Sequence, residues 1–202
     1  MPKIVVQAFM TLDGVVQAGG RPDEDLDGGF AHGGWQDGYA LDDSVRIWES
    51  RTEALLLGRR TYEIFAGSWG VWDEQAEGFQ GELTRRYNRI PKYVASRTLT
   101  AVSWQHTRLL EPDLAADVRR IRAEPETRPD AELRVWGSTQ LIRTLAELDL
   151  IDEYRLVVYP LVLGAGKRLF AEGFPVSRLA LAESRALPSG VVVQTYRPVV
   201  EN

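Results

Sequence analysis

The sequence contains no cysteine and only two histidines, His32 and His106. The lack of cysteine excludes a disulfide framework, a thiolate zinc site and a cysteine nucleophile. Since imidazole is the commonest metal ligand, the shortage of histidine argues against a metal site built on that residue. We therefore expect no bound metal.

Basic residues are also in short supply: 24 Lys and Arg stand against 29 Asp and Glu, a formal net charge of -5. A protein that binds duplex nucleic acid needs a concentrated basic surface, so we expect no nucleic-acid partner. No apolar run approaches the roughly 18 residues of a membrane span. The segment Met1-Pro2-Lys3 followed by Ile4-Val5-Val6 is too short before its first polar break for a signal peptide, so we expect a cytoplasmic protein without membrane contact.

The remaining composition is that of an ordinary soluble protein, with 44% hydrophobic and 26% charged residues in a chain of 202. A chain of this length buries roughly 70% of the surface that its unfolded form exposes, so it needs no staples to fold. With no repeat and no boundary in composition, we expect one domain over residues 1–202.

Short apolar segments alternate with segments of helical periodicity. Strands are expected at 3–9, 54–57, 93–95, 102–110, 133–136 and 151–159, and helices at 42–51, 59–65, 74–89 and 138–148, with another helix opened by Pro112-Asp113. Residues 179–187 and 191–196 flank Pro188-Ser189-Gly190, which predicts an antiparallel hairpin. The pattern indicates an α/β fold: a mostly parallel central sheet, covered on both faces, with a C-terminal antiparallel hairpin.

Two segments are expected to be loops. Residues 124–130 are charged and rich in proline, which predicts a surface loop. Residues 14–38 hold 8 of the 18 glycines together with Phe30 and Trp35. We predict that this glycine-rich loop is a lid that orders over bound ligand, because glycines permit closing and aromatic rings give the closed state something to bury. The alternative is a permanently ordered loop whose Trp35 fills a gap in the core.

Three polar turns follow predicted strands, and each suits an anion. Two are strand–Gly–helix junctions, where free N–H groups at a helix start favour negative charge. The third surrounds a guanidinium with two hydroxyls, which suits a phosphate monoester. The turns consist of Gly58, Arg59, Arg60 and Thr61; of Gly137, Ser138 and Thr139; and of Ser96, Arg97 and Thr98.

Each turn also has a plain interpretation: a tight turn with solvated arginines, helix capping by Ser138, and an ordinary polar turn at 96–98. Together, at the carboxyl ends of neighbouring strands, they indicate a ligand site. Two helix starts for a pyrophosphate and one arginine for an extra phosphate describe NADPH. The usual GxGxxG fingerprint is absent.

Several motifs, in this order and spacing, give the chain a family resemblance. They are Thr11-Leu12-Asp13-Gly14, Leu56 to Glu63, Lys92 to Leu99, Val135-Trp136-Gly137-Ser138, Leu150-Ile151-Asp152-Glu153 and Pro160 to Phe170. Over almost its whole length the chain resembles the dihydrofolate reductase-like reductases, specifically the RibD C-terminal type of riboflavin biosynthesis.

The resemblance implies a three-layer dihydrofolate reductase-like sandwich with NADPH across the carboxyl edge of its sheet, and a homodimer. It assigns the pyrophosphate to the turns at 58–61 and 137–139, the adenosine 2′-phosphate to the turn at 96–98, and the nicotinamide to Ala8 and Phe9. One departure is that dihydrofolate reductases carry Gly-Gly where this chain has Gly137-Ser138. A second is that no zinc deaminase half is present, so this chain cannot perform the deamination that the bifunctional riboflavin enzyme couples to reduction.

Hydride transfer needs a proton donor or an orienting carboxylate beside the acceptor. The candidates are Asp13, at the end of the first strand, and Asp42, at the start of the first helix. Their alternatives are a turn residue before glycine and a helix cap. Asp152 and Glu153 are read as structural, and Lys167 and Arg168 as a solvated loop that could instead neutralise a substrate phosphate.

Three functions are therefore weighed. The first is NADPH-dependent reduction of a small heterocycle, resembling the 5-amino-6-(5-phosphoribosylamino)uracil reductase. The second is dihydrofolate reduction. The third is NADPH binding without turnover.

Overall fold

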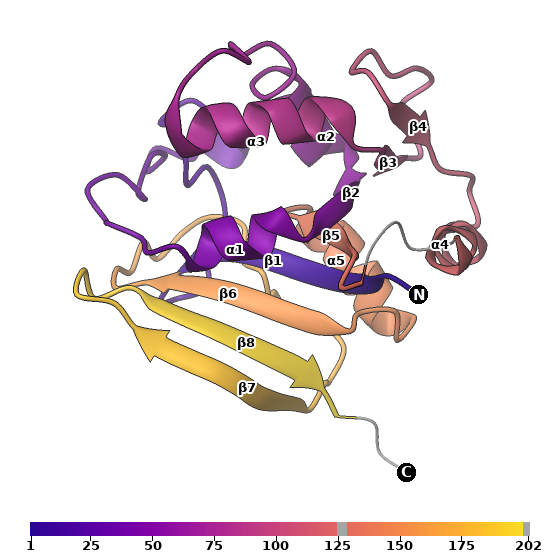
Figure 1. Cartoon of the computed structure of the whole chain (residues 1–202). Helices are drawn as coiled ribbons and strands as arrows, with labels where there is room; N and C mark the ends of the chain where they lie inside the picture. The colour runs from indigo at the N-terminus through magenta and orange to yellow at the C-terminus, as the bar shows by residue number, and fades with distance from the viewer. Residues whose placement is uncertain (125–128, 200–202) are drawn as a thin grey trace.

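A computed structural model describes residues 1–124 and 129–199, so residues 125–128 of the expected surface loop lie outside the described part. One sheet runs through the molecule in the order β4-β3-β2-β5-β1-β6-β8-β7 (Figure 1). The strands are β1 (Lys3–Thr11), β2 (Thr52–Gly58), β3 (Lys92–Ala95), β4 (Thr107–Leu109), β5 (Glu132–Trp136), β6 (Glu153–Tyr159), β7 (Leu179–Ala186) and β8 (Val192–Pro198). The helices are α1 (Ser44–Ser50), α2 (Arg59–Ala66), α3 (Gly78–Arg89), α4 (Leu114–Ala123) and α5 (Thr139–Glu147), with a short 3-10 turn η1 (Asp27–Gly29).

The predicted α/β sheet is confirmed. Every pair from β4 to β6 is parallel, and β8 pairs antiparallel with both β6 and β7. Since strands that run the same way end at the same edge, the residues that follow β3, β2, β5 and β1 meet along one carboxyl edge. Within the described residues, no helix is long and apolar enough to cross a membrane.

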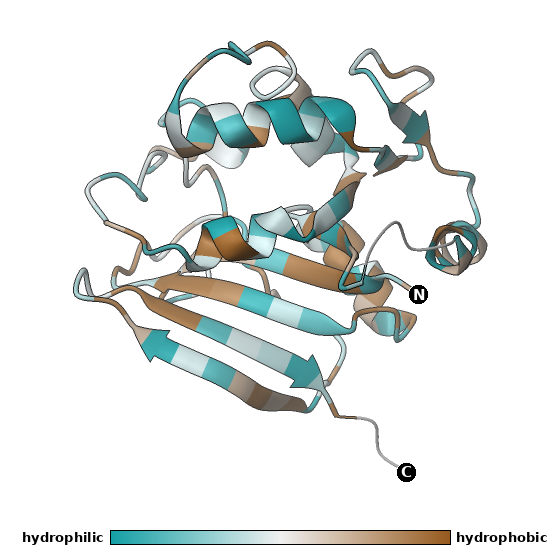
Figure 2. Cartoon of the chain, in the orientation of Figure 1, coloured by the Kyte–Doolittle hydropathy of each residue, from teal (hydrophilic) through white to brown (hydrophobic). Residues whose placement is uncertain are grey.

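Successive side chains along the central strands are buried alternately on the two faces of the sheet. Ile4, Val6 and Leu56 pack on the side of α4 and α5, whereas Leu55 and Leu57 pack against α2 and α3. Burial on both faces explains why β2 reads as an unbroken apolar run. In Figure 2 the central strand β1 carries a long brown stretch, while α3 is mostly teal and white on the side turned to the viewer.

Two expected elements are shorter than the sequence pattern indicates. The helix predicted from residue 74 begins at Gly78, because Asp73 holds the preceding residues in a turn and accepts a hydrogen bond from the Gln75 amide at 2.8 Å. The strand predicted over 102–110 is confined to β4. The amides of Ser103 and Trp104 donate to the Tyr62 hydroxyl at 2.9 and 3.2 Å instead of to a neighbouring strand.

The glycine-rich loop at 14–38 packs its aromatic residues into the protein. Phe30 and Trp35 are only 7% and 8% exposed. The Trp35 indole donates to the carbonyl of Gln17 at 2.8 Å, and its ring meets Tyr159 edge-on at 5.2 Å. These contacts match the ordered-loop alternative for the structure described. Whether ligand changes the mobility of the loop stays a prediction.

Candidate functional site

The three polar turns lie side by side at the carboxyl edge of the sheet. They follow β3, β2 and β5, which are consecutive in the sheet, and β1 comes next. The pairing of Gly58 with Ala95 places the first two turns at the same level of the edge. The prediction that these three turns follow neighbouring strands is therefore confirmed.

Ser138 links the two glycine junctions in a way that the sequence did not indicate. Its hydroxyl accepts a hydrogen bond from the Gly58 amide at 2.8 Å and donates to the Thr61 hydroxyl at 2.7 Å. The expectation that this hydroxyl caps α5 was wrong: Ser138 holds the N-cap position, but in a left-handed conformation with φ +55° and no capping bond from its side chain. The hydroxyl is occupied by residues that precede it by about 80 positions.

Close packing explains the glycines on either side of this link. A Cβ on Gly58 would lie 2.9 Å from the Ser138 hydroxyl oxygen, and one on Gly137 would lie 3.0 Å from that of Thr61. Gly137 also has φ +50°, which favours glycine. The starts of α2 and α5 are thereby held against one another, and neither carries a side-chain cap. The first amides of a helix have no acceptor within the helix, so at these two uncapped starts they can bind an acceptor from outside the chain.

The arginines of the first junction have partners of their own. Arg59 and Arg60 each lie 3.8 Å from Glu63. Arg60 also reaches Asp25 of the glycine-rich loop at 3.4 Å. Lys167 donates to the same Asp25 at 2.8 Å. The glycine-rich loop and the segment 161–168, which holds Lys167, therefore meet at the start of α2.

The turn at 96–98 leaves its arginine unoccupied. The Ser96 hydroxyl accepts hydrogen bonds from the amides of Thr98 and Leu99 at 3.2 and 2.9 Å, which fixes the turn. Arg97 is exposed and makes no hydrogen bond or ion pair with the described residues. Its guanidinium is therefore available to an anion at the edge of β3.

An aromatic pair lies beside the turns. Phe9 and Trp136, both half-buried, meet edge-on at 5.1 Å with their planes at 87°. Ala8 is 3% exposed and packs on the opposite face with Val6, so its side chain is in the core. Of the two residues predicted to line a nicotinamide, only Phe9 presents a side chain beside Trp136.

Asp13 is bonded to four groups of the protein. Its carboxylate accepts from the Thr11 hydroxyl at 2.6 Å, from the amides of Leu163 and Gly164 at 3.2 and 2.9 Å, and from Arg168 at 3.3 Å. The Thr11 hydroxyl, aided by these other donors and opposed by burial, holds the pKa of Asp13 well below its usual range. The bond from Thr11 fits the turn interpretation, and the other bonds, which that interpretation did not include, hold the 161–168 segment against β1.

Asp42 is likewise occupied. It accepts from the Ser44 amide at 2.9 Å and pairs with Arg185 of β7 at 2.7 Å. Burial would raise the pKa of Asp42, but the bonds from Ser44 and the charge of Arg185 outweigh burial and hold that pKa below its usual value. Both carboxylates are thus ionised and paired at neutral pH, and a catalytic role for either stays a prediction.

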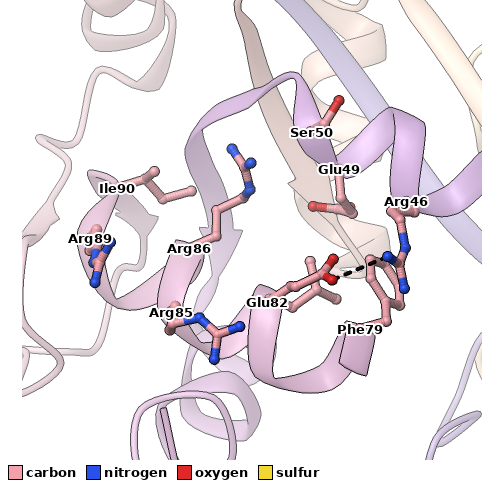
Figure 3. Close-up of a pocket in the computed structure, with 10 residues that line it drawn as sticks. Arg46, Glu49, Ser50, Phe79, Glu82, Arg85, Arg86, Arg89 and Ile90 are labelled. Atoms are coloured by element: carbon pink, nitrogen blue, oxygen red, sulfur yellow. Dashed lines mark hydrogen bonds and ion pairs between the residues drawn. The ribbon is translucent and has the colours of Figure 1, made fainter. Parts of the chain in front are cut away.

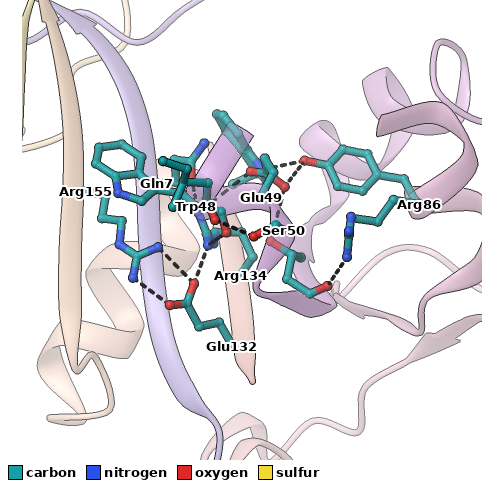
Figure 4. A network of polar contacts seen from close by, with 12 residues as sticks. Gln7, Trp48, Glu49, Ser50, Arg86, Glu132, Arg134 and Arg155 are labelled. Atoms are coloured by element: carbon teal, nitrogen blue, oxygen red, sulfur yellow. Dashed lines mark hydrogen bonds and ion pairs between the residues drawn. The ribbon is translucent and has the colours of Figure 1, made fainter. Parts of the chain in front are cut away.

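Sequence reasoning missed a buried polar network beneath α1. Arg134, on β5, is fully buried and bonds Gln7, Glu132 and the carbonyl of Trp48 (Figure 4). Arg155 binds both oxygens of Glu132 at 3.0 and 2.6 Å. The one available signal was the presence of charged residues inside β5 and β6, where a strand buried on both faces should be apolar.

A groove of about 420 Å³ lies between α1 and α3 (Figure 3). Arg46 and Glu82 pair across it at 3.1 Å. Arg86 reaches the carbonyl of Thr52 at 3.4 Å. Glu49 lines the groove although it is only 1% exposed. The groove thus brings the buried network close to the surface.

Comparisons with known proteins agree with this architecture. The chain is 26% identical to the uncharacterized protein YyaP of Bacillus subtilis over 198 residues, which are 96% of this chain and 94% of that protein. A putative riboflavin biosynthesis protein from Shewanella sp. PV-4 superimposes with a TM-score of 0.71 at 18% identity, covering 98% of this chain and 99% of that one.

Two other solved structures share the fold at lower identity. A pyrimidine reductase-like protein from Corynebacterium diphtheriae has a TM-score of 0.58 at 13% identity, covering 99% and 93% of the two chains. Dihydrofolate reductase from Enterococcus faecalis, complexed with NADP(H) and RAB-propyl, has a TM-score of 0.57 at 10% identity, covering 97% and 96%. The fold is therefore dihydrofolate reductase-like. A family model described as the RibD C-terminal domain matches residues 2–193, and the chain belongs to that family.

Proposed function

We propose that this protein is an NADPH-dependent reductase of a small heterocyclic substrate. One observation carries the proposal: α2 and α5 begin side by side without side-chain caps. The N-cap of α2 is Gly58, which has no side chain, and the N-cap of α5 is Ser138, which directs its hydroxyl to Gly58 and Thr61 instead. Two adjacent uncapped helix starts offer several amides and two positive dipole ends to one doubly charged anion. A pyrophosphate has that charge and size.

The neighbouring residues fit the rest of such a cofactor. Arg97, exposed and unpaired with the described residues, would bind the 2′-phosphate beside β3. Phe9 and Trp136 would form an apolar wall for the nicotinamide at the end of β1 and β5. When bound, NADPH supplies the hydride. The chain itself would bind the phosphates, orient the ring and exclude water from it.

Family membership supports a reductase of the riboflavin-biosynthesis type, and the Enterococcus relative of the same fold was solved with NADP(H). We propose a substrate resembling 5-amino-6-(5-phosphoribosylamino)uracil. Dihydrofolate is the alternative substrate. Binding of NADPH without turnover is the alternative function. It is favoured if reduction needs a free carboxylate, because Asp13 and Asp42 are both bonded to other groups of the protein.

The test begins with binding. Calorimetry with NADPH and NADH should give saturable, one-to-one binding that favours NADPH. Gly58→Val, whose side chain would collide with Ser138, should abolish the binding of both. Ala180→Val, at an exposed position of β7 far from the three turns, serves as a control. Oxidation of NADPH is then followed with the aminouracil substrate and with dihydrofolate. Binding without oxidation of NADPH by either substrate would favour the non-catalytic alternative, and absence of binding would refute the proposal.

A further inference from the structure

We propose that Tyr87 is a positioning residue for the reductase site: buried Glu49 fixes the Tyr87 hydroxyl, and that hydroxyl fixes the indole of Trp136 at the carboxyl edge. The inference rests on the proposed function, which places the cofactor at the carboxyl edge of the sheet. It assigns a role to a side chain that comes from α3 and is only 1% exposed.

The Tyr87 hydroxyl uses both of its hydrogen-bonding capacities. It donates to a carboxylate oxygen of Glu49 at 2.8 Å and accepts from the indole nitrogen of Trp136 at 3.0 Å. Burial, reinforced by the charge of Glu49, raises the pKa of Tyr87 well above its ordinary value. The hydroxyl therefore keeps its proton, and the direction of both bonds is fixed.

Packing alone does not explain a tyrosine at this position. The ring stacks on Phe65 at 6.0 Å and meets Trp69 edge-on at 5.5 Å, contacts that phenylalanine would make equally well. Burying a hydroxyl costs free energy unless the hydroxyl is hydrogen-bonded, and here the bonds to Glu49 and Trp136 offset that cost.

Glu49 gives the arrangement a rigid reference. The oxygen that accepts from Tyr87 also accepts from the Thr52 hydroxyl at 3.1 Å. The other oxygen lies 3.7 Å from Arg134, which is bonded in turn to Gln7 of β1. The Tyr87 hydroxyl is thus tied through one carboxylate to α1, β5 and β1.

Trp136 connects the Tyr87 hydroxyl to the carboxyl edge of the sheet. It is the last residue of β5, directly before Gly137-Ser138, and its half-buried ring is perpendicular to Phe9. Rotation of the indole would move the wall formed by these two rings. A displacement of about 1 Å in groups that orient a reactant can lower the rate about 100-fold.

The experiment compares Tyr87→Phe with Tyr154→Phe, an equally buried tyrosine on the opposite face of the sheet. In ¹⁵N-labelled protein without cofactor, the six tryptophans give indole N–H signals, and Trp136→Phe identifies the one from Trp136. In Tyr87→Phe that signal should shift and exchange with solvent at least about tenfold faster. In Tyr154→Phe it should be unchanged.

The second readout separates turnover from binding. Tyr87→Phe should lower the rate of NADPH oxidation about tenfold while the Kd for NADPH stays within about threefold of wild type. The double variant with Trp136→Phe should be no slower than Trp136→Phe alone, since both changes remove the same link. If Tyr87→Phe does not fold, the test uses Trp136→Phe instead. That variant must then oxidise NADPH more slowly than wild type while it still binds NADPH.

An unchanged Trp136 signal, or a shifted signal with wild-type turnover, would overturn the positioning role. Additive losses in the double variant would overturn it as well. A wild-type protein that does not bind NADPH would instead refute the proposed function, and the two failures are distinct because the indole signal is measured without cofactor.

Discussion

The Ser138 hydroxyl offers a direct measure of what holds the two helix starts together. Ser138→Ala removes the bond from the Gly58 amide and the bond to Thr61. At about 1 kcal/mol for each lost bond, the variant should unfold with a free energy about 2 kcal/mol lower than wild type. Because alanine tolerates φ +55° no better than serine, the backbone strain is unchanged.

Ser138→Gly provides the internal comparison. It loses the same two hydrogen bonds but relieves about 1 kcal/mol of left-handed strain, so its net loss should be about 1 kcal/mol. The Thr139 hydroxyl, next along the chain, makes no hydrogen bond with the described residues, so Thr139→Ala should stay within about 0.5 kcal/mol of wild type.

Urea unfolding without cofactor, followed by tryptophan fluorescence, gives these free energies. In thermal unfolding the alanine variant should melt about 4–8 °C lower than wild type. A Ser138→Ala variant that unfolds like wild type, or a glycine variant less stable than the alanine variant, would show that these two bonds do not hold the helix starts together.

Four further outcomes are expected. Arg97→Ala should weaken NADPH binding by about 10- to 100-fold and leave NADH nearly unchanged, with exposed Arg119→Ala as control; equal loss for both cofactors would remove the 2′-phosphate role. Asp13→Asn should cost about 2 kcal/mol at pH 7; because the folded pKa of Asp13 lies below the unfolded value, this contribution is complete above about pH 4 and is lost progressively as the pH falls from there toward the folded pKa, so a gap that persists undiminished at pH 3 and lower would contradict the assignment. Light scattering should give about twice the 22.7 kDa chain mass, and Leu181→Glu on the exposed edge strand β7 should give monomers; a monomeric wild type would end this proposal. Hydrogen exchange across residues 14–38 should slow when NADPH and substrate bind, whereas slow exchange already present in the free protein would leave Trp35 a packing residue.

The elements that could be predicted from the sequence are those in which the local pattern and the final environment agree. The apolar run Ala54–Leu57 reads as a buried strand and is one. The hairpin around Pro188-Ser189-Gly190 is fixed by its own turn, and β7 and β8 form on either side of it. The carboxyl-edge turns could be aligned because parallel strands all end at one edge.

The remaining features depend on contacts between distant residues. Ser138 is a good capping residue locally, and nothing near it in the sequence indicates that Gly58 takes its hydroxyl. The link from Glu49 through Tyr87 to Trp136 joins α1, α3 and β5, and each member has an ordinary local explanation: a helix charge, a core ring and a strand end. Asp13 was considered both as a catalytic carboxylate and as a turn residue, and its amide partners at 163 and 164 were not foreseen in either case.

The central position of β1 has a consequence for synthesis of the chain. Among the described strands, β1 pairs with β5 and β6, at residues 132–136 and 153–159, which are synthesised much later than β1 itself. Until those residues emerge, an apolar segment has both edges open, and such segments readily pair with other chains. The long stretch of chain between these strands also raises the entropy cost of closing the sheet, so we expect the pairing of β1 to be slow. A chain released before Glu132 would have no partner for β1 on either side and should be a substrate for chaperones.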